Sequence, residues 1–215
     1  MSEPAHVLVR VWLPDRPGAL GLVASRIGAV EGDIVGIDVL EHGGGVAVDE
    51  FAVVLRDVDA MSLLVREIEE VDGASVEEVR RVEHFPDPRL DALESANRLC
   101  GAPTVAALHD TLVAEIRAEF LADWSALLTV GTVLASSGEP VPDPCVLEAL
   151  EVGTAASPRV ADGTTGPDDL AVAAVPSFDA TLLVGREGHP FRRRERAQLL
   201  ALSRIAERTW TMLTR

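Results

Sequence analysis

Residues 6–20 read HVLVRVWLPDRPGAL, and this stretch decides the fold of the first part of the chain. Its apolar side chains fall on every second position, at Val7, Val9, Val11 and Leu13. Alternation with a period of two predicts a β-strand with one strongly apolar face. The turn-forming residues at positions 15–18 then end the strand, and the chain restarts as a helix.

Helix and strand patterns continue to alternate as far as residue 82. The helix after the turn has one apolar stripe at i, i+3, i+4 and i+7 spacing, formed by Leu20, Val23, Ala24 and Ile27. Residues 34–40 and 46–55 are predicted strands, joined by a hairpin of three glycines. A second helix follows, capped by Asp57 or Asp59, and residues 75–82 form a charged strand at a sheet edge. The order βαββαβ predicts a ferredoxin-like α+β fold, with an antiparallel four-stranded sheet and both helices on one face.

Pro86 and Pro88 mark a domain boundary, because two prolines so close together fit neither a helix interior nor a central strand. We therefore expect a first domain over residues 1–83, a linker over 84–102 and a second domain over 103–215. The second domain is predicted to contain a helix at about 103–122, a strand or hairpin at 124–134 and an irregular middle with a short helix near 145–150. Paired strands at 170–175 and 181–185 and a last helix at about 193–213 complete an α+β domain with an antiparallel sheet.

The composition argues against several classes of function. The chain has 215 residues, 35 acidic and 19 basic, and a formal charge of −16. Such a surface repels phosphate backbones and anionic lipid, so we expect neither nucleic acid nor membrane as a partner. There is no long apolar run and no secretory leader pattern, so we expect a cytoplasmic protein. The basic run RRRER at residues 192–196 is an exception, which we expect to contact acidic surface elsewhere in the chain or in a partner subunit.

Residues 15–20 carry the most specific chemical signal in the chain. Pro17 sets a helical φ at the helix entrance, and Gly18 lacks the Cβ that would keep a ligand away from the backbone. The N–H groups of Gly18, Ala19 and Leu20 are predicted to point outward and to stabilise a carboxylate. Asp15 is placed to accept bonds from an ammonium group. The alternative is a capped turn, in which Asp15 only satisfies the first N–H groups of the helix.

The first domain resembles the ACT domain, a small regulatory module found on enzymes of amino-acid metabolism. Three features carry the resemblance over residues 6–82: the βαββαβ order, the segment DRPGAL at 15–20, and the segment EGDI at 31–34. The resemblance implies a homodimer that binds a small-molecule effector, such as an amino acid, near the first loop. It also implies the ligand-binding residues: Asp15, Arg16, Pro17, Gly18, Ala19 and Leu20, with Asp33 and Ile34 from the start of the second strand. Asp15 stands where amino-acid-binding members often have asparagine; it would hold an ammonium group and repel a nearby carboxylate.

The second half resembles the GAF domain. The segments LAVAAVP at 170–176, ATLLVGR at 180–186 and HPF at 189–191, followed by the last helix, carry this resemblance. It implies an antiparallel sheet with either a small-ligand pocket or a dimer interface formed by the terminal helices.

No catalytic or metal-binding constellation emerges from the sequence. The five histidines have no partners at i+3 or i+4 of metal-binding type, and no nucleophile elbow, Walker loop or dinucleotide fingerprint occurs. Cys100 and Cys145 are expected to be ordinary buried or half-buried thiols. We therefore expect a non-enzymatic allosteric sensor without metal or cofactor. Ligand binding at the ACT-like domain would change its structure, and this change would be transmitted to the GAF-like domain. The alternative is a ligand-free module for dimerisation or protein interaction.

Overall fold

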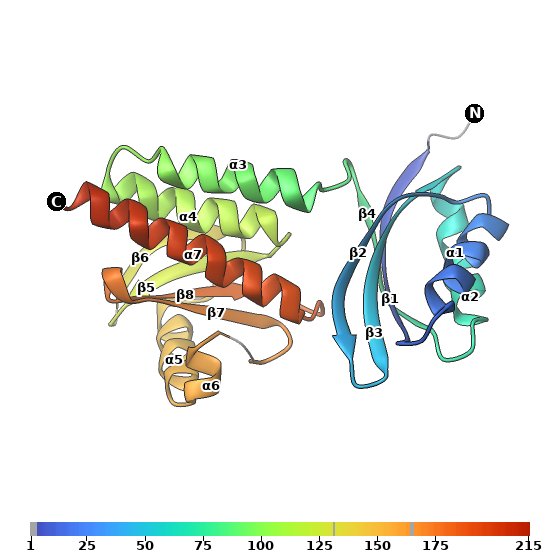
Figure 1. Ribbon diagram of the computed structural model, residues 1–215. Helices are drawn as coiled ribbons and strands as arrows, with labels where there is room; N and C mark the ends of the chain where they lie inside the picture. Colours follow the sequence, from blue (N-terminus) through green and yellow to red (C-terminus); the bar gives the residue numbers. More distant parts are fainter. Residues whose placement is uncertain (1–3, 131, 164–165) are drawn as a thin grey trace. The chain divides into compact units, whose positions relative to one another are not determined.

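A computed structural model of the chain describes residues 4–130, 132–163 and 166–215. The chain divides into two compact units, Met1–Pro86 and Asp87–Arg215. Each unit has its own four-stranded antiparallel sheet with helices packed against it (Figure 1). In the described parts of the chain, no helix has both the length and the apolar character needed to cross a membrane.

The first unit has the element order βαββαβ. Its strands are β1 (Ala5–Pro14), β2 (Asp33–Gly43), β3 (Val46–Leu55) and β4 (Ser75–Val82); its helices are α1 (Ala19–Ala29) and α2 (Met61–Glu69), the latter preceded by the 3-10 turn η1 (Val58–Ala60). The sheet order is β2-β3-β1-β4, with antiparallel neighbours throughout. Both helices cover the same face of the sheet (Figure 1). The predicted ferredoxin-like fold is therefore confirmed.

The apolar face of β1 forms the centre of this unit's core. Val7, Val9 and Val11 are fully buried and pack in one cluster with Phe51 and Val53 of β3. The stripe on α1 differs from the prediction, because the buried residues are Ala19, Val23 and Ile27. Successive helix positions differ by about 100°, so a stripe that begins at Ala19 turns Leu20 toward solvent. Leu20 is 38% exposed.

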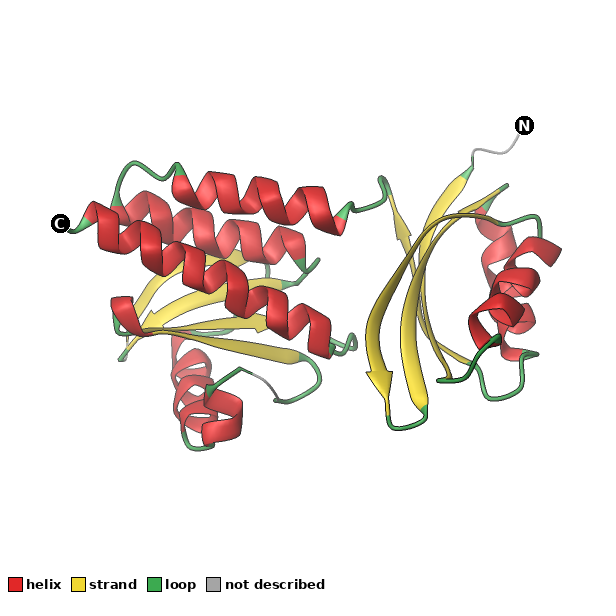
Figure 2. Ribbon diagram, in the orientation of Figure 1, coloured by secondary structure: helices red, strands yellow, loops and turns green. Residues whose placement is uncertain are grey.

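The second unit has helices on both faces of its sheet. Its helices are α3 (Pro88–Cys100), α4 (Val105–Glu119), α5 (Pro144–Ala155), α6 (Pro158–Ala161) and α7 (Arg193–Leu213), with the 3-10 turn η2 (Pro176–Phe178); its strands are β5 (Trp124–Thr129), β6 (Thr132–Gly138), β7 (Leu170–Val175) and β8 (Ala180–Gly185). The sheet order is β6-β5-β8-β7. Helices α3, α4 and α7 lie on one face, and α5 and α6 lie on the other (Figure 2). The predicted α+β class with an antiparallel sheet is confirmed.

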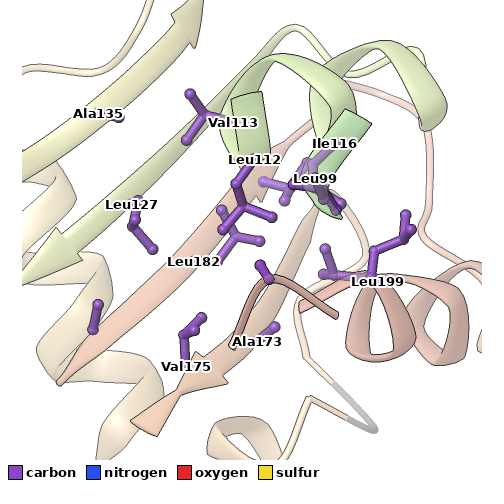
Figure 3. Close-up of a cluster of buried hydrophobic side chains, with 14 of the residues drawn as sticks. Leu99, Leu112, Val113, Ile116, Leu127, Ala135, Ala173, Val175, Leu182 and Leu199 are labelled. Atoms are coloured by element: carbon purple, nitrogen blue, oxygen red, sulfur yellow. The ribbon is translucent and has the colours of Figure 1, made fainter. Parts of the chain in front are cut away.

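The larger core of the second unit lies between the sheet and the three-helix layer. Leu112 of α4, Leu99 of α3 and Leu199 of α7 converge on Leu127 and Leu182 of the central strands (Figure 3). A smaller apolar cluster fills the opposite face of the sheet under α5. Both faces of β5 and β8 are thus buried, which explains why their sequences are nearly continuous apolar runs.

Two expectations need correction. Residues 84–102 were predicted to be a linker, but residues 88–100 form α3, which packs against the second unit's core. Proline is tolerated in the first turn of a helix, and Asp87 caps this one by accepting bonds from the N–H groups of Arg89 and Leu90, both at 3.1 Å. Cys100 and Cys145 are exposed instead of buried, because each lies in a terminal turn of a helix.

Candidate functional site

The loop between β1 and α1 is a tight turn tied to the neighbouring hairpin. The N–H of Asp15 donates to Gly45 O (3.0 Å), and the N–H of Arg16 donates to Pro14 O (2.8 Å). Gly18 immediately precedes α1 with φ +90° and ψ −16°, in the left-handed region that glycine tolerates. A Cβ at this position would meet no atom within 4 Å, so the backbone conformation selects glycine here, not crowding. Because α1 begins at Ala19, Pro17 belongs to the turn and not to the first turn of the helix.

The N-terminus of α1 offers N–H groups to a ligand, although not the full predicted set. The N–H of Ala19 donates to Arg16 O (3.3 Å), so the prediction that it points outward is wrong. In the part of the chain that the structure describes, the N–H groups of Gly18, Leu20 and Gly21 have no backbone acceptor. The first α-type bond is that of Leu22 N–H to Gly18 O (3.1 Å). These free donors lie at the positive end of the helix dipole, where an anion is stabilised.

The structure rules out the capped-turn interpretation of Asp15. The residue before α1 is Gly18, and no side chain in the described ranges caps this helix. Asp15 is exposed, and its carboxylate makes no hydrogen bond or ion pair with any described residue. The adjacent Arg16 is turned toward Asp72, with Nη2 3.9 Å from Oδ2. The carboxylate of Asp15, three positions before Gly18 in the sequence, is therefore available to a ligand.

A second carboxyl group near this loop was missed by the sequence analysis. Asp49 on β3 pairs with Val11 of β1 and Val39 of β2, on the side of the sheet that faces the helices. It is only 4% exposed, and its Oδ1 has no hydrogen-bond partner among the described residues. Burial, and then the negative charge of Asp15, raise the pKa of Asp49. The signal was present in the sequence, because Asp49 interrupts the apolar alternation of residues 47–55.

The structure separates two predicted site residues from the loop. Asp33 and Ile34 begin β2, where they pair with Val54 and Val53 of β3. The loop lies at the opposite end of β3, where Val46 pairs with Pro14. Ala47, which pairs with Leu13 near the loop, and Val53, which pairs with Ile34, are six positions apart on β3. Along a strand, six positions span roughly 20 Å. In one chain, therefore, Asp15, Arg16, Pro17, Gly18, Ala19 and Leu20 are together, and Asp33 and Ile34 are not with them.

The second unit contains a separate hollow of about 810 Å³ at one end of its sheet. Here β5 and β7 begin, while β6 and β8 end. Trp124, Leu150 and Leu170 provide apolar wall, and the charged lining comes from Asp123, Glu139, Asp169, Glu187, Arg186 and His189. The indole ring of Trp124 packs directly against Gly185. A Cβ at position 185 would overlap with this ring, so the contact requires glycine. The hollow is lined by more acidic than basic groups.

The basic groups near this hollow hold the fold together. Arg186 is 2% exposed, donates from Nη1 to Phe120 O (2.8 Å) and pairs with Glu195 at 2.9 Å. Arg196 is 5% exposed and donates to Leu170 O (3.0 Å) and Pro167 O (2.8 Å). Within the basic run at 192–196, Arg196 thus fixes the backbone at the start of β7, and the expected contact of the run with acidic surface stays a prediction.

Burial also shifts the pKa values of His109 and Glu119 in the second unit. Burial lowers the pKa of His109, whose ring packs against Phe178. Burial raises the pKa of Glu119, which accepts hydrogen bonds from Ser95 and Gln198. Both lie in or beside the three-helix layer, away from the residues that line the hollow.

No protein-family model matches the chain, and no curated protein matches it either. The ACT domain from GTP pyrophosphokinase of Chlorobium tepidum is 18% identical, with 38% of this chain and 100% of that chain covered and a TM-score of 0.30. The GAF domain from Acinetobacter phosphoenolpyruvate-protein phosphotransferase is 12% identical, covering 60% and 96% with a TM-score of 0.43. The chromophore-binding domain of an unusual bacteriophytochrome from R. palustris is 9% identical, covering 97% and 94% with a TM-score of 0.41. None of these values assigns the chain to a family.

Proposed function

We propose that the protein is a non-catalytic allosteric sensor whose first unit is an ACT-type domain that binds an amino acid or a similar zwitterion at residues 15–20. The observation that carries the proposal is that one loop offers both free N–H donors and a carboxylate. Free N–H groups of Gly18, Leu20 and Gly21 lie at the positive end of α1, close in sequence to Asp15, whose carboxylate has no partner among the described residues. The N–H groups suit the carboxylate of a ligand, and Asp15 suits its ammonium group.

The proposal includes a homodimer that completes the site. Asp33 and Ile34 lie too far from the loop in one chain to touch the same small ligand, so they would contribute from a second copy. The edge strand β2 supports self-association, because Val35 (53%), Ile37 (43%) and Val39 (45%) are all exposed on it. A ligand held between two copies stabilises the assembly that binds it, which couples binding to subunit arrangement.

The second unit is proposed to act as a GAF-like domain that receives this change. Its antiparallel sheet with helices on both faces and its hollow beside Trp124 are the features that support this role. The connection between the units is short, since β4 ends at Val82 and α3 begins at Pro88. Because the connection is this short, few backbone torsions can change in it, and a rearrangement of the first unit would be transmitted to α3.

Isothermal titration of the full chain with each of the twenty amino acids tests the sensor function. We expect a saturable heat and a higher melting temperature with at least one of them. Gly18→Asp places a carboxylate next to the free N–H groups at the start of α1 and should abolish both effects. Gly188→Asp is the matched control, because Gly188 also has a positive φ (+72°) and open space around it but lies in the second unit. If no amino acid binds, or if Gly18→Asp binds as well as the control, the proposed site is refuted.

The alternative is a ligand-free assembly module, favoured by the exposed apolar residues on β2 and by Leu90 (52%) and Leu93 (69%) on α3. Under this alternative, Val35→Lys would dissociate the dimer in sedimentation experiments, and amino acids would leave the sedimentation profile unchanged. Under the sensor function, the ligand shifts the monomer–dimer equilibrium.

A further inference from the structure

Asp49 is an isolated carboxyl group in an otherwise apolar layer. Its neighbours two positions away on β3, Ala47 and Phe51, both belong to the buried core, as does its cross-strand partner Val11. A buried polar group without a partner costs free energy that packing alone does not recover. An aliphatic side chain at this position would fit the pattern of the strand. The position therefore calls for an explanation other than stability of the unliganded protein.

Among the described residues, no basic group pairs with Asp49 or with Asp15. Asp15 lies four residues beyond Val11, the cross-strand partner of Asp49, and its charge adds to burial in disfavouring ionisation of Asp49. Arg16, the nearest basic residue in sequence to Asp15, is turned toward Asp72. No group of three or more metal-type ligands exists among the described residues, which leaves this pair short of what a metal ion requires. Two neighbouring carboxyls with too few ligands for a metal suit an ammonium group, which donates up to three hydrogen bonds.

Apolar surface continues from Asp49 along the edge of the sheet. Val39 pairs directly with Asp49, and Ile37 pairs with the buried Phe51, so both face the side that carries the helices. They are nevertheless 45% and 43% exposed, because α1 and α2 do not cover this part of β2. A ligand whose ammonium group reaches Asp49 would find aliphatic surface for its side chain at these two residues.

We propose that Asp49, together with Asp15, accepts the protonated amine of the ligand and makes the site select small aliphatic amino acids over the corresponding carboxylic acids. This inference rests on the proposed function and assigns the ligand class of the same site. The N–H groups at the start of α1 would bind the ligand's carboxylate, as any carboxylic acid could. The two aspartates add the selectivity, because an anion without an amine meets two carboxyls and offers them no donor.

The experiment compares matched ligands with and without the amine. Leucine and valine are titrated into the full chain beside 4-methylpentanoate and 3-methylbutanoate, which have the same carbon skeletons without the amino group. We expect the wild-type protein to bind leucine or valine at least tenfold more tightly than its deaminated counterpart. Asp49→Asn should weaken binding of the amino acid about tenfold to hundredfold, since hydrogen bonds to charged groups are worth that much, and should leave little preference for the amine. Glu69→Gln removes one exposed charge at the end of α2 and should bind as the wild type does.

Each result separates this inference from the proposed function. If Asp49→Asn, with an unchanged circular dichroism spectrum, binds leucine and valine as tightly as the wild type, the role of Asp49 is refuted and the sensor function stands. If another of the twenty amino acids binds but no aliphatic one does, the ligand class is refuted alone. If no amino acid binds to the wild-type protein, both proposals fail.

Discussion

Replacing Asp49 with asparagine should stabilise the first unit at neutral pH, even though it removes a charged group from the proposed site. The residue is 4% exposed, and its Oδ1 has no partner among the described residues, so no hydrogen bond to this atom offsets its loss of hydration. A buried polar group in this situation costs about 1–3 kcal/mol, and a charged one costs more. Asparagine keeps the shape without the charge but retains a polar amide, so we expect a gain of about 1 kcal/mol in the free energy of unfolding.

The gain should depend on pH in a direction fixed by the pKa of Asp49. Burial and the charge of Asp15 raise this pKa above its ordinary value of 3.8, so the folded protein holds the proton more tightly than the unfolded chain does. The wild-type protein therefore loses stability as the pH rises from the unfolded pKa through the higher folded pKa. Asparagine does not titrate, so the gain in the free energy of unfolding should be small near pH 4 and larger near pH 7. The gain should stop growing once Asp49 of the wild-type protein is fully ionised.

Urea unfolding followed by fluorescence measures this effect. The chain has three tryptophans, and replacing Trp124 and Trp210 with phenylalanine leaves Trp12 of β1 as a reporter of the first unit. Glu69→Gln, an exposed site, should change the free energy of unfolding by less than about 0.5 kcal/mol. A lower stability of Asp49→Asn would show that the Asp49 carboxyl makes stabilising contacts, and a gain that is equal at both pH values would contradict the raised pKa of Asp49.

Three other substitutions and one chemical reaction test the structure. Gly18→Ala should destabilise the first unit by roughly 1–2 kcal/mol in the same urea assay, because Gly18 has a left-handed backbone conformation. Gly21→Ala, inside α1, should instead stabilise this unit by about 0.5–1 kcal/mol. Equal effects of the two substitutions would contradict the loop geometry. Arg196→Met removes two hydrogen bonds to the carbonyls of Pro167 and Leu170 and should cost the second unit about 2 kcal/mol, read from Trp124 and Trp210 fluorescence; a neutral result would show that these bonds contribute nothing. Cys100 and Cys145 are exposed, so both should react with an aromatic disulfide reagent in the folded protein, and a thiol that reacts only in denaturant would contradict its placement.

The fold of the first unit was predictable because local patterns and tertiary packing agree there. The strand at residues 46–55 and the strand at 75–82 occur with the predicted bounds, since glycine turns and apolar alternation define both ends. The linker prediction is wrong at α3 because proline is compatible with the first turn of a helix: Pro88 begins a helix that Asp87 caps. A proline pattern alone does not distinguish these two cases.

The candidate site was predictable only in part. Residues 15–20 announce a turn into a helix, but which N–H groups stay free depends on the left-handed Gly18 and on the bond from Ala19 to Arg16 O, neither of which a sequence specifies. Asp49 was visible as a polar residue on an apolar stripe. Its connection to Asp15 depends on the pairing of β3 with β1, which brings residues distant in sequence together. The separation of Asp33 and Ile34 from the loop also follows from strand register, which local patterns do not encode.

Ligand binding at residues 15–20 is measured most directly by nuclear magnetic resonance, with the backbone amide signals of an isotope-labelled sample followed while amino acids are added. We expect the signals of Gly18, Leu20 and Gly21 to move together and to saturate at one ligand concentration, with Ala19 less affected because its N–H is already bonded to Arg16 O. If these three signals stay fixed while others around Trp124 respond, the ligand binds to the second unit and the proposed site is refuted.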